Sequence, residues 1–383
     1  MTRTCLLTAI IAMLVSSPAF AKDAGVFLVR LGNDTTAVER YVRTSKRLEV
    51  HQVGRAPRLL RRHFVYDLDH DRVKRLSVVV TPPDSDTPTQ TIAATFQDSA
   101  RIAIDTPGRP TQTVTLVVPR DAVVVSTSSP WTGYEAAIQR LMKSRSDSLR
   151  TTIYFLGGDQ VYWMSLHRVG RDSVAVANGH LDVFRARVDK SGHILGMRPI
   201  AGTGKFTVER RDDLDVDAMT ATFVAREKAG ASLGTLSPRD SVVTSVAGAS
   251  LWIDYGRPAK RGRVVFGNVV PYGELWRTGA NAATQFRTDK ALNFGGTTIP
   301  AGFYTLWTVP TAQGWKLIVN GQTGQWGTEH DAARDIATID MKVETLPLPE
   351  ERFTIRVEPA EGGGVLRMDW DTTRASAPFQ VVP

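Results

Sequence analysis

Short apolar segments separated by turn residues run through the first half of the chain. Segments such as residues 26–31 and 76–80 are rich in β-branched and aromatic side chains, and turn pairs such as Asn178-Gly179 separate them. Such a pattern is typical of β-strands joined by tight turns. We therefore expect residues 25–210 to form a strand-rich meander.

Two segments of this half show helical periodicity instead. In the first, Ser129-Pro130 supplies an N-cap and a first-turn proline, and the apolar positions share one face: Trp131, Tyr134, Ile138, Leu141 and Met142. In the second, the apolar positions after Asp215 are Val216, Met219 and Phe223. The sequence predicts a β-rich, half-barrel-like N-terminal domain over residues 22–229, with helices near residues 130–146 and 215–229. The pattern resembles the half-open barrels of periplasmic lipoprotein carriers.

The second half of the chain is also β-rich but has a different composition. Residues 230–246 contain small residues, Pro238 and no aromatic side chain, which predicts a linker. Strand patterns then recur over residues 283–288, 302–309, 315–320, 352–358 and 365–370, with one short helix expected over residues 329–336. We expect residues 247–383 to form a β-sandwich or jelly roll, so the fold class is mainly β.

The N-terminal segment has the features of a signal peptide. Arg3 precedes an apolar stretch over residues 5–15, and Ala19-Phe20-Ala21 is a small-x-small cleavage site. About 11 apolar residues are too few to span a bilayer. We expect cleavage after Ala21 and a periplasmic or secreted protein.

Composition and charge narrow the possible chemistry. The chain has 383 residues, 42% of them hydrophobic, which excludes wholesale disorder and a polytopic membrane protein and suggests two domains. Its only cysteine, Cys5, lies in the predicted signal peptide, so we expect neither disulfides nor thiolate metal sites in the mature chain. A formal charge of +8 favours acidic partners. Export makes nucleic acid an unexpected partner, and the oligomeric state stays open.

Three motifs could indicate a catalytic serine, a phosphate loop and a metal site, but the sequence around each of them does not fit that function. Residues 230–234 match G-x-S-x-G, but no strand precedes the serine and no helix follows it, as a nucleophile elbow requires. Residues 202–205, Gly-Thr-Gly-Lys, precede a strand and are better explained by a hairpin turn than by a phosphate loop. His167, His180 and His193 alternate between the two ends of the expected sheet, so we predict no metal site there and no cofactor.

The densest polar cluster lies between residues 254 and 284. Arginine forks suit carboxylates or phosphates, and aromatic rings offer stacking faces for sugars. The residues that we expect to line a ligand site are Arg257, Lys260, Arg263, Tyr272, Trp276, Arg277, Asn281 and Thr284. The alternative is a structured loop whose arginines bind backbone carbonyls.

The same region is familiar as a sequence. Residues 256–289 read GRPAKRGRVVFGNVVPYGELWRTGANAATQFRTD, and GTTIPAGFYTLWTVP and LRMDWDTTRASAPF follow. Together they resemble the bacterial family called domain of unknown function 2911 over residues 245–382. His330 departs from the pattern, since relatives tend to carry an aromatic residue there. The resemblance implies an exported β-sandwich and supplies no chemistry, and nothing familiar covers residues 22–244.

Three functions are compatible with these features. The first is a binding module for an anionic or glycan-like ligand. The second is a hydrolase that uses Glu274 or His330 with Asp331 or Asp335 as acid and base, although acidic residues also favour a helix start. The third is a structural or partner-binding envelope protein. Whether the Arg257–Thr284 side chains converge on a pocket or bind within the loop would distinguish them.

Overall fold

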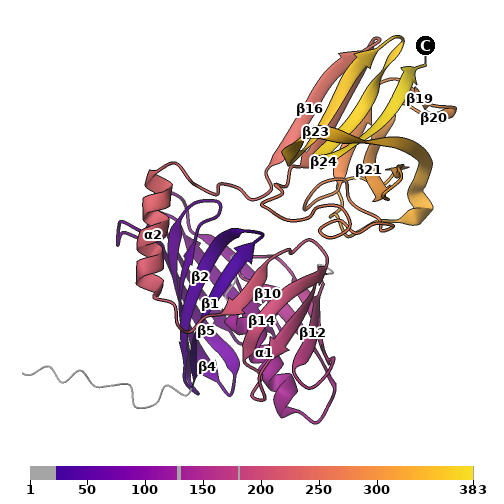
Figure 1. The fold of residues 1–383 in the computed structure, drawn as a ribbon. Coiled ribbons are helices and arrows are strands. Elements are labelled where there is room, and N and C mark those ends of the chain that lie inside the picture. The colour runs from indigo at the N-terminus through magenta and orange to yellow at the C-terminus, as the bar shows by residue number, and fades with distance from the viewer. Residues whose placement is uncertain (1–22, 127–130, 180–181, 383) are drawn as a thin grey trace, which may run out of the picture.

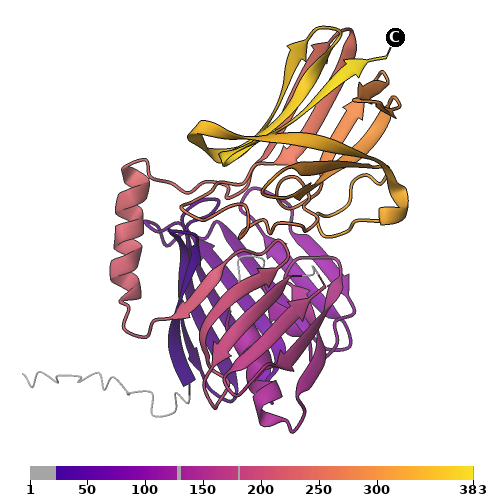
Figure 2. The ribbon, with the colours of Figure 1, turned by 45° about the vertical axis from the view of Figure 1, so that its right-hand side comes forward.

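The chain forms two β-rich halves joined by a short connection (Figure 1, Figure 2). This computed structural model describes residues 23–126, 131–179 and 182–382. The mainly β fold class is confirmed. The predicted signal peptide, Ser129, Pro130 and His180 lie outside the described residues. The helices that the structure describes are all too short or too polar to cross a membrane.

The N-terminal half is a single sheet of 15 strands. Strands that follow one another in the chain pair with one another, and β1 also pairs with β15. The strands are β1 Asp23–Leu31, β2 Asp34–Arg43, β3 Arg47–Gly54, β4 Leu60–Asp69, β5 Arg72–Thr81, β6 Gln90–Phe96, β7 Ala100–Asp105, β8 Gln112–Leu116, β9 Val123–Val125, β10 Ser148–Phe155, β11 Val161–Arg168, β12 Ser173–Asn178, β13 Val183–Val188, β14 Ile194–Ala201 and β15 Thr207–Arg210. The edge strands β8 and β9 do not pair with each other, so the curved sheet stays open.

Two helices cover opposite faces of this sheet. Helix α1, Thr132–Lys143, lies against the concave face, where Ile138 and Leu141 pack with inward residues such as Phe27 and Phe64. Helix α2, Val216–Lys228, covers the convex face (Figure 1). There its Val216 and Phe223 pack with Val26, Val38, Val53 and Leu59, which alternate with the inward residues. Both helices were predicted, and the Asp215 carboxylate caps α2 by accepting from the Asp217 and Ala218 N–H groups.

The C-terminal half is a continuous sheet of nine strands that folds over on itself. The fold lies in the long strand β23, whose pairing with β24 shifts between Thr345 and Thr354. The strands are β16 Arg239–Val246, β17 Ala249–Gly256, β18 Thr284–Thr288, β19 Leu292–Phe294, β20 Thr297–Ile299, β21 Gly302–Pro310, β22 Trp315–Asn320, β23 Asp335–Ala360 and β24 Gly363–Val381. Residues of both layers share one core, which includes Leu251, Leu317, Phe353 and Trp370.

Two details of this half differ from the sequence prediction. The second part of the expected linker is strand β16, which pairs along its whole length with β17. The sheet covers only one of its faces, so its sequence lacks the large apolar residues that mark a strand. The helix expected over residues 329–336 is a single 3-10 turn, Ala332–Arg334, because the chain enters β23 at Asp335.

A tight pair of loops joins the two halves. Between β1 and β2, the Asn33 N–H donates to the Arg261 carbonyl over 3.1 Å, and Arg261 forms an ion pair with Asp34. Gly32 and Gly262 both have positive φ angles, +62° and +70°. A Cβ atom on Gly32 would lie 2.3 Å from the Arg261 carbonyl oxygen, so glycine is required for this contact.

Candidate functional site

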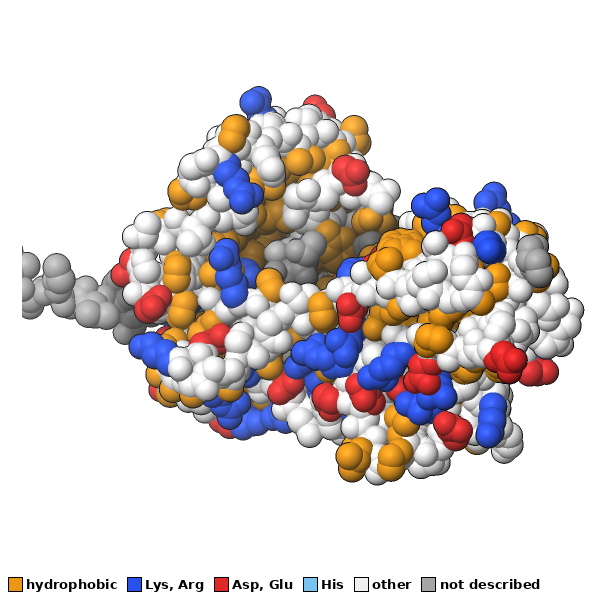
Figure 3. Space-filling model, turned by 90° about the horizontal axis from the view of Figure 1, so that it is seen from above, with side chains coloured by type: hydrophobic (Ala, Val, Ile, Leu, Met, Phe, Trp, Pro, Cys, Tyr) orange, Lys and Arg blue, Asp and Glu red, His pale blue; other side chains and the backbone are white. Residues whose placement is uncertain are grey.

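A large cavity lies inside the curved sheet and extends to the C-terminal half. Its volume is about 1680 Å³, above the roughly 300–1,000 Å³ of ordinary small-molecule pockets. Its wall in the N-terminal half is largely apolar but also carries the arginines Arg58, Arg62 and Arg109. The apolar residues include Val29, Leu31, Leu60, Val78, Val80, Ile92, Ile104, Trp131 and Phe184. Figure 3 shows a hollow with apolar side chains on its walls beside the C-terminal half. The described side chains of the N-terminal half therefore leave part of the space inside the sheet unfilled.

Three cationic side chains meet where the two halves border this cavity. Lys205 comes from the loop between β14 and β15, and Arg263 and Arg277 come from the loops between β17 and β18. Asp182 holds the first loop in place by accepting from the Thr203 and Gly204 N–H groups over 2.6 and 2.8 Å. Cations from both halves thus border the same part of the cavity, which we call its mouth.

The electrostatics of the mouth reflect this crowding of positive charge. Burial, followed by the charges of Arg277 and Arg263, lowers the pKa of Lys205 to about 8, although Asp182 and Glu274 oppose the shift. Burial also lowers the pKa of Arg277 to about 10. Lys205 has no hydrogen bond or ion pair with any residue that the structure describes, and only one weak hydrogen bond, from Arg277 to the Gly327 carbonyl at 3.5 Å, holds the Arg277 guanidinium. An anion at this mouth would therefore relieve an existing repulsion.

Gly327 brings the loop after β22 onto the stem of Arg277. A Cβ atom at this position would lie 2.0 Å from the Arg277 Cδ atom and 2.3 Å from the Asn281 carbonyl oxygen. The Gly327 N–H donates to that same carbonyl over 2.9 Å. The loop therefore fixes the aliphatic part of Arg277 by packing, while its Nε atom is buried without a described hydrogen-bond partner.

The structure brings about half of the sequence-predicted site residues to the cavity. Those in its wall are Arg263, Glu274, Trp276, Arg277, Asn281 and His330. Two of them are also bound internally: Arg263 donates to the Ala259 and Lys260 carbonyls, and the Trp276 ring belongs to the aromatic core. Arg277 is the sequence-predicted cation with the fewest partners of its own.

The remaining predicted ligand residues have structural contacts elsewhere. Arg257 binds Thr354 and Asp240, Lys260 forms an ion pair with Asp371, and Thr284 is fully buried with its hydroxyl donating to the Thr278 carbonyl. Tyr272 is exposed and lies outside the cavity wall. For these positions the interpretation as an internally bonded loop describes the geometry better than a ligand site.

The residues of the catalytic alternative are only partly assembled. The His330 Nε2 atom lies 2.8 Å from an Asp335 carboxylate oxygen, and its ring packs against Trp307. Asp331 instead caps the 3-10 turn by accepting from the Ala333 N–H group, and Glu274 is exposed at the cavity rim. One of the assigned pairs, His330 with Asp335, is therefore assembled, and its histidine belongs to the cavity wall.

Sequence reasoning missed the cavity residues of the N-terminal half. Lys205 belongs to the Gly-Thr-Gly-Lys segment, which is indeed the turn between β14 and β15, yet its side chain reaches the cavity. Arg62 lies on the inner face of β4, where it donates to Gln52, and Arg58 and Arg109 also line the cavity. The available signal was an arginine among the otherwise apolar inward positions of β4.

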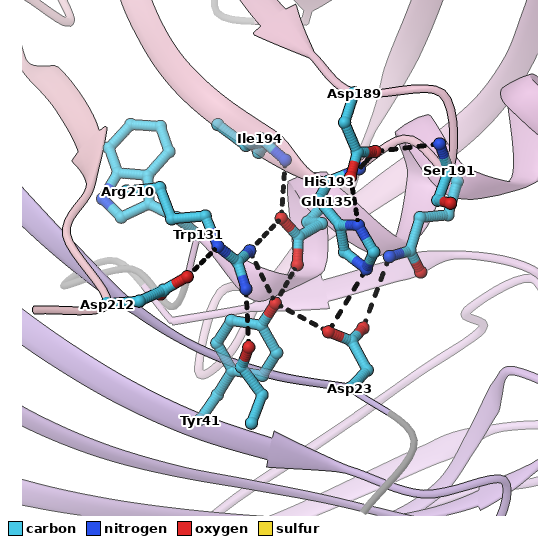
Figure 4. Close-up of polar contacts among 12 residues, drawn as sticks. Asp23, Tyr41, Trp131, Glu135, Asp189, Ser191, His193, Ile194, Arg210 and Asp212 are labelled. Carbon is cyan, nitrogen blue, oxygen red and sulfur yellow. Dashed lines mark hydrogen bonds and ion pairs between the residues drawn. The ribbon is translucent and has the colours of Figure 1, made fainter.

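A second polar cluster lies between α1 and the concave face and is internally paired (Figure 4). The Tyr41 hydroxyl lies 2.5 Å from the Glu135 carboxylate, which also accepts from the Ile194 N–H and lies 3.4 Å from Arg210. His193 lies between Asp189 and Asp23, at 2.7 and 3.3 Å. Because each charge has a partner, we assign this cluster to holding α1 inside the sheet.

Comparisons with known proteins identify the C-terminal half only. Residues 237–379 match the family described as "Protein of unknown function (DUF2911)", as the sequence resemblance predicted, and the N-terminal half matches no family. No curated protein matches the chain.

Solved structures give only weak likenesses. A beta-barrel-like protein of domain of unknown function DUF1849 from Brucella abortus is similar with 9% identity, 49% of this chain and 94% of that chain covered, and a TM-score of 0.34. Caulobacter crescentus pol III beta is similar with 10% identity, 97% and 94% covered, and a TM-score of 0.11. At these TM-scores neither likeness bears on function.

Proposed function

We propose that this protein, after export and removal of residues 1–21, binds an anionic amphiphile in the cavity between its two halves. The apolar tail would occupy the hollow of the N-terminal sheet, and the anionic head group would lie against Lys205, Arg263 and Arg277. One observation carries the proposal: a largely apolar cavity of about 1680 Å³ is bordered by cations of both halves, of which Lys205 has no partner among the described residues and Arg277 has one weak hydrogen bond.

The geometry favours an apolar tail over a glycan. Sugars are recognised by exposed aromatic faces with polar groups around them. Here the Trp276 ring is buried in the aromatic core, and Tyr272 lies outside the cavity wall. Aliphatic side chains, with Val78, Val80 and Ile104 among them, line the cavity beside the rings of Trp131 and Phe184. Burial of apolar surface is therefore the main binding energy that this cavity can offer.

Titration with 1-decanesulfonate, followed by tryptophan fluorescence, tests the proposal. Its sulfonate stays ionised and its tail is apolar, whereas decanol lacks the charge and methanesulfonate lacks the tail. We expect saturable binding of decanesulfonate, with at least about tenfold weaker binding of the other two, since each loses one of the two contributions. Equal affinity for decanol and decanesulfonate would remove the role of the cations.

A matched pair of variants locates the head-group site. Lys205→Gln removes the cation that has no described partner, and Lys190→Gln removes an exposed lysine in the turn after β13. We expect Lys205→Gln to weaken decanesulfonate binding about tenfold, the effect of losing one charge-assisted contact, and Lys190→Gln to leave it unchanged. If both variants bind like the parent, the ligand site is elsewhere.

Export is tested separately. N-terminal sequencing of protein from a periplasmic extract should begin at Lys22. A chain that begins at Met1 in that extract would contradict cleavage, without bearing on the cavity.

A further inference from the structure

Three potential metal ligands lie together on the convex face of the N-terminal sheet, away from the cavity. Glu49 and His51 are two residues apart on β3, so they point to the same face, and His63 lies directly opposite His51 on β4. The alternating residues Leu48, Val50 and Phe64 are buried in the core on the other side. The three polar side chains therefore face outward.

The ligand atoms of these residues are close to one another. The Glu49 Oε1 atom lies 2.7 Å from the His63 Nε2 atom and 3.5 Å from the His51 Nε2 atom. The Glu49 oxygen and the two imidazole nitrogens all lie within 4.8 Å of one another, and the two rings stack with their centroids 4.2 Å apart. A single ion could contact all three after small side-chain rotations.

We propose that Glu49, His51 and His63 bind one divalent transition-metal ion of the zinc class on this face. Two imidazoles and one carboxylate are a ligand set that zinc uses in sites with an open fourth position. Imidazole ligands also exclude magnesium and calcium as the preferred ions, since those ions prefer oxygen.

The surroundings are compatible with such an ion. The three side chains are 35%, 47% and 37% exposed, so an ion can reach them from solvent. All three come from paired strands, which hold ligand positions more firmly than loops do. Arg47 of the same strand lies 3.5 Å from the other carboxylate oxygen of Glu49, Oε2, which leaves Oε1 facing the histidines. Arg40 on β2 lies opposite His51 in the register and is within 3.8 Å of the Asp217 carboxylate of α2.

The ion would replace the proton of the hydrogen bond between His63 and Glu49. The short contact between His63 and Glu49 requires a proton between Nε2 and the carboxylate oxygen. In the metal-bound form the neutral His63 ring would carry its proton on Nδ1, so that the Nε2 lone pair and the carboxylate oxygen both become ligands.

Zinc titration of the metal-free, full mature chain without a histidine tag tests this proposal. We expect calorimetry to show one zinc ion per chain and the Co²⁺ form to show visible absorption bands of low-symmetry coordination. His51→Ala and His63→Ala should each weaken zinc binding at least about tenfold, because each removes one of three ligands. Glu49→Gln keeps the shape of the side chain and should also weaken it.

His167→Ala is the matched control, because His167 is an exposed histidine on β11 of the same sheet. It should bind zinc like the parent. Thermal melts of the metal-free variants should coincide with that of the parent, since the three side chains are partly exposed. Absence of saturable zinc binding by the parent, or binding that survives loss of both His51 and His63, would overturn the proposal. Decanesulfonate binding at the cavity should not change in any of these variants, so failure here leaves the proposed ligand site untouched.

Discussion

The N-terminal half curves its sheet around a hollow, whereas the C-terminal half fills the space between its layers with aromatic rings. In the C-terminal core, Trp276 packs against Trp315, Phe353 and Trp370 at centroid distances of 5.0–6.1 Å. In the N-terminal half, α1 occupies only part of the concave face, and the cavity takes the rest. The loops of the C-terminal half that are rich in arginine and aromatic residues therefore contribute mainly to the packing of that half. The space for a ligand lies in the N-terminal half, where the sequence suggested no site.

The largest expected effect is a loss of stability in the aromatic core of the C-terminal half, compared with a smaller loss in the cavity wall of the N-terminal half. Phe353→Ala in the aromatic core should lower the free energy of unfolding by about 3–5 kcal/mol, because a fully buried ring leaves a void that its rigid neighbours cannot fill. Ile104→Ala in the cavity wall should cost only about 1 kcal/mol, since the hollow already exists beside it. Urea unfolding measures both. Equal losses would show that the cavity is closed by packing in solution.

Glu39 provides a pH test of the N-terminal half. Its fully buried carboxyl accepts from the Trp131 N–H over 2.6 Å, and burial raises its pKa from 4.5 to about 8. The folded state thus holds the proton more tightly than the unfolded state. Its contribution to stability is complete below pH 4.5 and is lost as the pH rises to about 8.

Glu39→Gln removes this dependence while keeping an acceptor for the Trp131 N–H. The variant should be more stable than the parent at pH 8.5, by about 2 kcal/mol or more, and the difference should shrink towards pH 5. Glu361→Gln, an exposed change in the C-terminal half, should leave the pH profile of the urea midpoint as it is. A parallel shift of the Glu39→Gln profile at all pH values would contradict a raised pKa.

The contact between the halves can be weakened without disturbing either core. Gly32→Ala places a Cβ atom 2.3 Å from the Arg261 carbonyl oxygen, whereas Gly295→Ala, with a nearly equal φ of +60° against +62°, meets nothing within 4 Å. Both changes cost about 1 kcal/mol of backbone strain. Only Gly32→Ala should also speed proteolysis of the connection at residues 229–238, by several-fold. Equal cleavage rates would mean that the loop pair does not hold the halves together.

Much of the fold could be predicted from sequence because it depends on local patterns. The β-branched segments, the Asp215 cap and the turn residues identify strands and helices directly. Strand β16 was missed because its few apolar residues, Val242, Val243 and Val246, lie among small polar and charged residues at a sheet edge. The candidate site could be predicted only in part, since sequence cannot show whether a cation is already bound. Lys260 has Asp371 as a partner, whereas Lys205, far from Arg277 in the chain, has none that is described.

Two arginines of the C-terminal half should separate structure from binding. Arg374 holds the buried Asp369 carboxylate through two hydrogen bonds of 2.7 Å, whereas Arg277 has only the weak bond to Gly327. Arg374→Lys should lower the free energy of unfolding by about 2 kcal/mol and leave decanesulfonate binding unchanged. Arg277→Lys should change stability by less than about 1 kcal/mol and weaken decanesulfonate binding about tenfold, because the planar fork is lost. A large stability loss in Arg277→Lys would make this arginine structural.

The smallest expected effect is the pH dependence that Lys205 gives to ligand binding. Burial and the two arginines lower its pKa to about 8, so its ammonium begins to lose its proton within the range where the protein is easily studied. Decanesulfonate stays ionised throughout, and the arginines stay charged because even Arg277 has a pKa of about 10. The affinity of the protein for decanesulfonate should therefore fall a few-fold between pH 7 and pH 9. In Lys205→Gln the affinity should be weak and constant over the same range. A fall of the same size in the variant would assign the titration to another group.

Proton uptake on binding at pH 8.5, measured by calorimetry in buffers of different ionisation enthalpy, should also occur in the parent and not in the variant, because the bound anion raises the pKa of the lysine beside it.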